Sequence, residues 1–259
     1  MVPIVRQTRQ MRLTFVILLP PSEGKAEGGR ARTRWKPASG TFGPALGSRR
    51  GEVAAALAAL GGGSAGLLGV GGKHLERAQV ANQSIVGAPT LPAAERYTGV
   101  VWDHLDLAGM TAAQRDRALP RIIVPSGLMG ATLAGDPVPD YRLKMGARLP
   151  GFTGTMAKWW HEAVSEAVNT YAAGCVVIDL LPAEHRGSYS PDPSLISDHV
   201  IVDLVTPTGK AGGHDAKAAK GRLARHLLLS TPLIASHKDL AAATKKFSDQ
   251  RFRVVTKVN

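Results

Sequence analysis

Apolar residues gather in short runs along the chain, and polar, glycine-bearing or proline-bearing stretches end most of these runs. Runs rich in β-branched residues predict strands at 13–19, 121–125, 175–181, 199–206 and 252–257. Between them, helical spacing of apolar residues predicts helices at 49–60, 111–118, 155–172, 214–229 and 237–245. Because strands and helices alternate, we expect an α/β fold: a single domain with a mixed, mostly parallel sheet flanked by helices.

No shift in composition marks a boundary inside residues 12–259, so we expect one domain over that range. Residues 1–11 are polar and basic, and we expect them to be disordered or a non-native start, with Met1 and Met11 as alternative start sites. The apolar run at 13–19 is about a third of a bilayer span, so we expect no membrane partner. The single cysteine, Cys175, falls in an apolar run, which predicts a buried residue and a cytoplasmic protein.

Charge is the unusual global property of the chain. The 32 Lys and Arg residues exceed the 20 Asp and Glu residues, which gives a formal net charge of +12. A basic protein attracts polyanions, so nucleic acids and phosphorylated ligands are the expected partners.

Two strand ends carry small polar residues of chemical interest. The stretch PPSEGK places Ser22 and Lys25 after the first strand, and VPSGLMG places Ser126 and Gly127 after the second. Ligands of open α/β sheets bind at such strand ends, where a lysine pairs with phosphate or carboxylate. The alternative is a plain turn that ends each strand.

Basic side chains also cluster in two later segments. DYRLKMGARLPG holds Arg142 and Arg148, whose guanidinium groups match the geometry of phosphate and carboxylate. HDAKAAKGRLARHLL places Lys217 and Lys220 on one face of a predicted helix. Either segment is equally compatible with a solvated basic surface.

The stretch LLGVGGKHLERA fits a helix-hairpin-helix pattern. In that pattern Gly69 and Gly71 form a turn whose backbone amides, with Lys73, hold a DNA phosphate without reading sequence. A glycine-rich link between two helices is the commoner explanation.

Acid–base chemistry has one candidate location. Asp179, Glu184 and His185 follow the third strand in IDLLPAEHRGSY. The histidines show no metal-binding spacing, so we expect neither a metal nor another cofactor.

Six motifs, LLPPSEGK, SGLMG, YRLKMGARL, KWWHEAV, VVIDLLPAEH and AKAAKGRLARHLL, occur in an order that resembles the YaaA family of peroxide stress proteins, in its PPSEGK-bearing, actinobacterial-like branch. The resemblance implies a YaaA-like fold with a positively charged cleft that binds double-stranded and irregular DNA and limits oxidative damage. Several positions of this chain match the motifs of the family: Lys25, the SGLxG turn, the YRLxMGxRL segment, Trp160, Lys217 and Gly221. Many members have other residues at Asp179, His185 and Lys220, which weakens an acid–base role there.

Two functions follow as expectations. The first is a DNA-binding protein of the peroxide stress response, with salt-sensitive contacts to the nucleic-acid backbone and no sequence specificity. The second is an enzyme that acts on a small phosphorylated, nucleotide-like or carboxylate substrate in the same cationic pocket, with Ser22, Lys25, Asp179, Glu184 or His185 as catalytic candidates. Convergence of Lys25, Arg142 and Lys217 in one closed cavity would favour the enzyme.

Overall fold

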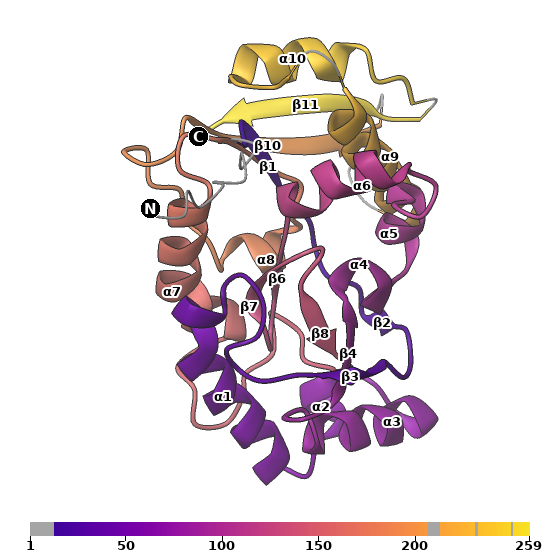
Figure 1. Cartoon of the computed structure of the whole chain (residues 1–259), viewed down its shortest axis with the longest axis vertical. Coiled ribbons are helices and arrows are strands. Elements are labelled where there is room, and N and C mark those ends of the chain that lie inside the picture. Colours follow the sequence, from indigo (N-terminus) through magenta and orange to yellow (C-terminus); the bar gives the residue numbers. More distant parts are fainter. Residues whose placement is uncertain (1–12, 207–212, 231–232, 250) are drawn as a thin grey trace, which may run out of the picture.

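The structure of the protein is a computed structural model, and it describes residues 13–206, 213–230, 233–249 and 251–259. Within these residues the central sheet has six strands in the order β11-β10-β9-β1-β6-β7 (Figure 1). The strands are β1 (Phe15–Leu18), β6 (Ile122–Ser126), β7 (Gly130–Leu133), β9 (Val176–Asp179), β10 (Asp198–Val205) and β11 (Arg253–Val258). β10, β9, β1 and β6 run parallel, whereas β7 and β11 pair antiparallel at the two edges.

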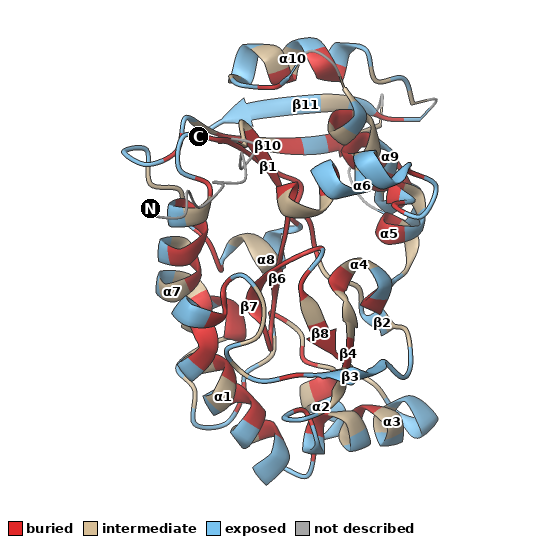
Figure 2. Ribbon diagram, viewed as in Figure 1, coloured by how far each residue is buried: buried red, intermediate tan, exposed pale blue. Residues whose placement is uncertain are grey.

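Continuous apolar runs explain why the middle strands are central. Every residue of β1, β6 and β9 is buried, as expected for strands covered on both faces (Figure 2). The edge strand β7 is buried along its whole length as well. β11 is exposed along almost all of its length, which suits an edge strand.

Two small sheets extend the fold beyond β1. The first pairs β3 (Arg30–Arg34) with β4 (Pro89–Pro92), and β4 with β8 (Pro137–Pro139). The second pairs β2 (Gly24–Lys25) with β5 (Tyr97–Thr98), so that Lys25 lies opposite Tyr97. These short pairs fix the chain that leaves β1 and carries PPSEGK.

Helices surround the sheets. The longer ones are α1 (Gly43–Ala59), α3 (Gly72–Gln83), α7 (Met156–Tyr171), α9 (His214–Leu229) and α10 (His237–Lys245). The shorter ones are α2 (Ala65–Leu68), α4 (Ala93–Arg96), α5 (Val100–Leu105), α6 (Ala112–Ala118), α8 (Ala183–Arg186) and the 3₁₀ turn η1 (Leu119–Arg121). α2 and α3 lie at one end of the molecule, and β11 and α10 lie at the other (Figure 1). None of the helices in the described residues is long and apolar enough to cross a bilayer.

The expected α/β fold class is confirmed, and so are the five expected strands and five expected helices, with small shifts at their ends. The largest shift is in α1, which begins at Gly43 with Pro44 in its first turn, six residues before the expected start. The glycine-rich segment 126–154 contains the short strands β7 and β8, which the sequence pattern did not predict. Residues 1–11, expected to be disordered or non-native, lie outside the described residues.

Close packing of α9 on α5 explains the glycine in the motif AKAAKGRLARHLL. A Cβ atom at Gly221 would lie 2.3 Å from the Val101 carbonyl oxygen, so only glycine allows the two helices to approach this closely. α9 is thereby fixed beside the sheet, with Lys220 near the end of β9.

Candidate functional site

Lys25 sits where the chain returns from the end of β1. Its Nζ donates a hydrogen bond to the Ser22 carbonyl at 2.9 Å. It also lies 4.4 Å from the centre of the Tyr141 ring and 5.5 Å from that of Tyr97. Lys25 forms no salt bridge with any carboxylate among the described residues. The amine is therefore held by a carbonyl and two ring faces rather than by an opposite charge.

The hydroxyl groups of the two tyrosines form a chain that ends at Ser126. Tyr97 and Tyr141 share a hydrogen bond of 3.0 Å, and the Tyr141 hydroxyl donates to Ser126 Oγ at 2.8 Å. All three residues are buried. Burial raises the pKa of Tyr141 well above its ordinary value and raises that of Tyr97, so both phenols stay protonated at neutral pH.

Burial is also the main influence on Lys25. It disfavours the charged amine and lowers the pKa of Lys25 to about 7. Asp140 and Glu23 oppose this shift, whereas Arg142 and Arg96 add to it. At neutral pH a large part of the Lys25 population therefore carries a free electron pair.

A carboxylate from PPSEGK lies between two cations next to Lys25. Glu23 Oε2 is 2.8 Å from Arg142 Nη2, and Glu23 Oε1 is 3.1 Å from Lys144 Nζ. Partial burial raises the pKa of Glu23, but the hydrogen bond and charge of Lys144, together with Arg142, outweigh this effect and leave the pKa below its ordinary value. The pair of cations forms an anion site, and the protein's own Glu23 carboxylate occupies it.

Two cavities meet at this group. One of about 50 Å³ is lined by Lys25, Glu23, Arg142 and His185, among others. The second, of about 390 Å³, is lined by Lys25, Glu23 and Arg142 as well, with side chains from α3. His185 Nδ1 is buried and has no hydrogen-bond partner in the described part of the chain, and burial lowers the pKa of His185. The smaller cavity thus joins four of the five predicted catalytic candidates, Ser22, Lys25, Glu184 and His185.

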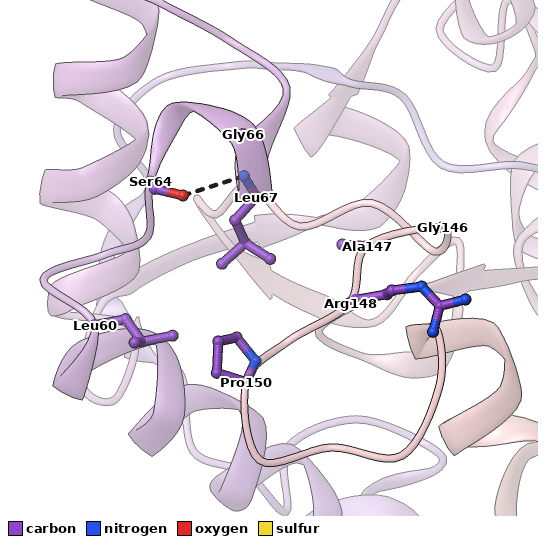
Figure 3. Close-up of a pocket in the computed structure, with 8 residues that line it drawn as sticks. All are labelled: Leu60, Ser64, Gly66, Leu67, Gly146, Ala147, Arg148 and Pro150. Atoms are coloured by element: carbon purple, nitrogen blue, oxygen red, sulfur yellow. Dashed lines mark hydrogen bonds between the residues drawn. The ribbon is translucent and has the colours of Figure 1, made fainter.

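A third cavity, of about 550 Å³, lies beside the predicted hairpin (Figure 3). Ser64, Gly66 and Leu67 from the start of α2 face Gly146, Ala147 and Arg148 across it. The Gly69–Gly71 turn joins α2 to α3, with Gly69 at a φ of 62°. A Cβ atom at Gly69 would lie 3.0 Å from Lys144 Nζ, so the turn directly contacts the 142–148 segment.

Asp179 and Lys220 lie at the end of β9. Asp179 is buried, accepts a hydrogen bond from Leu181 N at 2.7 Å and pairs with Arg186 Nε at 3.2 Å. Lys220 Nζ donates to the Leu180 carbonyl, and burial lowers the pKa of Lys220 to about 8. Asp179 is engaged in internal ion pairing, while its proposed role in proton transfer stays a prediction.

Contacts with other segments hold the other predicted residues in position. Ser126 and Gly127 are buried, and a Cβ atom at Gly127 would lie 2.6 Å from the Leu143 carbonyl oxygen. Glu184 accepts a hydrogen bond from Gly146 N at 2.7 Å, which ties α8 to the 142–148 segment. The Ser22 hydroxyl donates to the Thr98 carbonyl. Lys217 is exposed on α9 and lines none of the three cavities.

Sequence reasoning did not identify Tyr97 and Arg77 as site residues. Tyr97 follows the short helix α4 and reaches Lys25 only through the β2–β5 pairing. Arg77 lies on α3, pairs with Asp140 at 2.9 Å and donates to the Lys25 carbonyl at 2.9 Å. Tyr97 stands in no motif, and Arg77 falls within LLGVGGKHLERA but outside the Gly69–Lys73 part that the pattern singles out. No local signal in the sequence distinguishes either residue.

The fold and this site define an α/β protein in which basic loops surround a partly buried lysine at the carboxyl edge of a mostly parallel sheet. The chain belongs to the family described as peroxide stress protein YaaA, whose model matches residues 15–255. It is 36% identical over 219 residues to UPF0246 protein SCO2297 of Streptomyces coelicolor, which covers 83% of each chain. It is also 36% identical over 222 residues to UPF0246 protein CE1889 of Corynebacterium efficiens, covering 83% of this chain and 86% of that relative. The family resemblance is confirmed.

Proposed function

We propose that this protein binds the DNA backbone in the cytoplasm as part of the peroxide stress response and limits oxidative damage to DNA. The observation that carries the proposal is the contact between the Gly69–Gly71 turn and the basic 142–148 segment. This contact places backbone amides and cationic side chains beside one another, next to the cavity in Figure 3.

The first turn of α3 supplies the amides. The first backbone hydrogen bond of α3 runs from Leu75 N to the Gly71 carbonyl, at 3.4 Å. The amides of Gly72, Lys73 and His74 precede it and have no partner within the helix. Amides at the start of a helix favour an anion such as a phosphate, and the exposed Lys73 adds a positive charge.

Contacts of this kind predict affinity without base recognition. Phosphate contacts fix a protein on DNA but carry no sequence information. The exposed Arg148 and the net charge of +12 add attraction that salt screens.

The direct test is binding of duplex, bulged and single-stranded DNA at about 50 and about 200 mM salt. We expect affinity for each DNA to fall at least about tenfold with the added salt, because every neutralised phosphate releases counterions. Lys73→Ala and Arg148→Ala should weaken binding to all three DNAs and reduce the salt slope by about 1 each.

Lys257→Ala is the matched control, because Lys257 is exposed on β11, at the opposite end of the molecule from α3 (Figure 1). It removes the same charge and should leave affinity nearly unchanged. Salt-insensitive binding, or an equal loss for Lys257→Ala, would contradict the proposal.

The second candidate is an enzyme that acts on a small anionic substrate, and one observation favours it. Lys25 and Arg142 both line the 390 Å³ cavity, a size typical of small-molecule sites. Lys217 does not line it, so only two of the three residues chosen to distinguish the functions share a cavity. Isothermal titration with inorganic phosphate, comparing wild type with Arg142→Gln, tests this candidate; equal heats for the two proteins would argue against it.

A further inference from the structure

Lys25 combines three features that the DNA-backbone contacts proposed above do not use. Its Nζ lies against two tyrosine ring faces, it has no carboxylate partner in the described residues, and it lines two cavities at once. A lysine that serves only as a phosphate contact gains nothing from being withdrawn behind aromatic rings.

The surroundings of the Lys25 amine favour its use as a nucleophile that adds to a carbonyl group. The tyrosine hydroxyls point into the chain that ends at Ser126, so Lys25 meets ring faces rather than hydroxyl groups. Both phenols are protonated and are therefore no competing bases. A lysine amine in a desolvated pocket typically reacts with a carbonyl carbon to form a Schiff base.

The neighbouring cations indicate what else the carbonyl compound carries. Arg142 and Lys144 hold an anion beside Lys25, and that anion is the exposed end of Glu23, which a phosphate can displace. Arg77 lines the same 390 Å³ cavity and adds another guanidinium group. The site therefore fits a short aldehyde with a phosphate group.

We propose that Lys25 forms a Schiff base with the open-chain aldehyde of 2-deoxyribose phosphate. This sugar phosphate occurs free and, where DNA has lost a base, within the DNA backbone; the second source rests on the proposed function. The Nζ electron pair attacks the aldehyde carbon and a C–N bond forms. One proton moves from nitrogen to the former carbonyl oxygen and gives a carbinolamine. The nitrogen then loses its second proton to the departing hydroxyl group, so that the C–O bond breaks, water leaves and the neutral imine remains.

Neutral amine is the reactive form, and the position of Lys25 supplies it. With a pKa of about 7, about half of Lys25 is neutral at pH 7, against about one part in a few thousand for an ordinary lysine. Asp140, Glu23, Arg142 and Arg96 are the charged groups that face this amine. Reaction at Lys25 should therefore exceed reaction at exposed lysines by about a hundredfold or more at pH 7.

The test is reductive trapping. The full-length protein is incubated at pH 7 with sodium cyanoborohydride and one of three probes: free 2-deoxyribose 5-phosphate, a duplex with a single abasic site, or the same duplex intact. Hydride adds to the imine carbon and a proton to nitrogen, which leaves a stable secondary amine that peptide mass mapping locates.

We expect the adduct on the peptide that contains Lys25 with at least one of the first two probes, and no adduct with the intact duplex. Labelling by the free sugar phosphate alone supports the amine chemistry and assigns a small-molecule source. Labelling by the abasic duplex supports the DNA source. Adducts spread over exposed lysines without preference for Lys25, or no adduct with either aldehyde, overturn the proposal.

Two variants of the protein serve as controls in the trapping experiment. Lys25→Met should lose the adduct, and Lys257→Ala should keep it. Because the mapping is done on wild type, a misfolded Lys25→Met does not weaken the test. DNA affinity is measured on the intact duplex separately, so loss of DNA binding with retained labelling by the free sugar phosphate rejects the proposed function and leaves this inference standing.

Discussion

The side-chain nitrogen of Lys25 lies 4.4 Å from the centre of the Tyr141 ring. A ring face attracts a cation, but here the same ring also removes water from the amine. Burial of the amine is the main cause that lowers the pKa of Lys25 to about 7. Tyr141 is therefore a ring neighbour of an amine whose charged form is disfavoured by burial.

Titration of Lys25 follows directly. Reductive ¹³C-methylation and NMR should give one lysine signal with a midpoint near pH 7, assigned to Lys25 by its absence in Lys25→Met. Asp140→Asn should lower that midpoint further, because the Asp140 carboxylate favours the charged amine. Lys257→Ala should leave it unchanged. A Lys25 midpoint near 10 would show that the amine is solvated after all.

The same shift predicts how stability depends on pH. The folded protein binds the Lys25 proton less tightly than the unfolded chain, so between about pH 7 and 10 the unfolded state holds more protons and stability rises with pH. Below pH 7 the full penalty for the buried charge is present. Lys25→Met should therefore raise the melting temperature at pH 6 relative to wild type, with a smaller gain at pH 9.5. An equal gain at both pH values would rule out the charge as the cause.

Glycine positions in the SGLMG turn lead to a packing prediction. Gly130 has a φ of 65°, and a Cβ atom there would lie 2.7 Å from Trp160 Cε3. Gly61 has a similar φ of 60°, with no atom within 4 Å of its Cβ position. Gly61→Ala should cost about 1 kcal/mol from backbone strain alone. Gly130→Ala adds overpacking against a buried indole and should cost about 2–4 kcal/mol.

Urea unfolding of the two glycine variants measures this difference. Because both substitutions have nearly the same backbone strain, the excess for Gly130 reports the Trp160 contact. Equal destabilisation would mean that Trp160 moves aside without penalty.

The sequence predicted the sheet and the long helices because their information is local. Continuous apolar runs and helical spacing are read within a few residues, and the strands and helices formed close to where these patterns lie. PPSEGK and YRLKMGARL were likewise visible as motifs, and the structure brings their residues Glu23 and Arg142 to 2.8 Å.

What the sequence could not predict depends on contacts between distant segments. Arg50 is fully buried and donates hydrogen bonds to the carbonyls of Met129 and Ala131, about 80 residues away. The sequence alone places it on a helix with an ordinary charged side chain. Lys25 is similar, because its low pKa comes mainly from burial, which only the fold supplies. The fold also places its Nζ beside the rings of Tyr97 and Tyr141.

The last prediction concerns Asp179, which is buried and shares one arginine with an exposed carboxylate. Arg186 Nε is 3.2 Å from the buried Asp179, and Arg186 Nη2 is 3.1 Å from the exposed Asp203. Asp179→Asn should destabilise the fold by about 2–3 kcal/mol, because it removes a buried charge that pairs with Arg186. Asp203→Asn should cost below about 1 kcal/mol, since water screens the exposed pair. Denaturant unfolding of the two variants at pH 7 measures both values, and a larger loss for Asp203→Asn would show that the exposed contact, not the buried one, anchors Arg186.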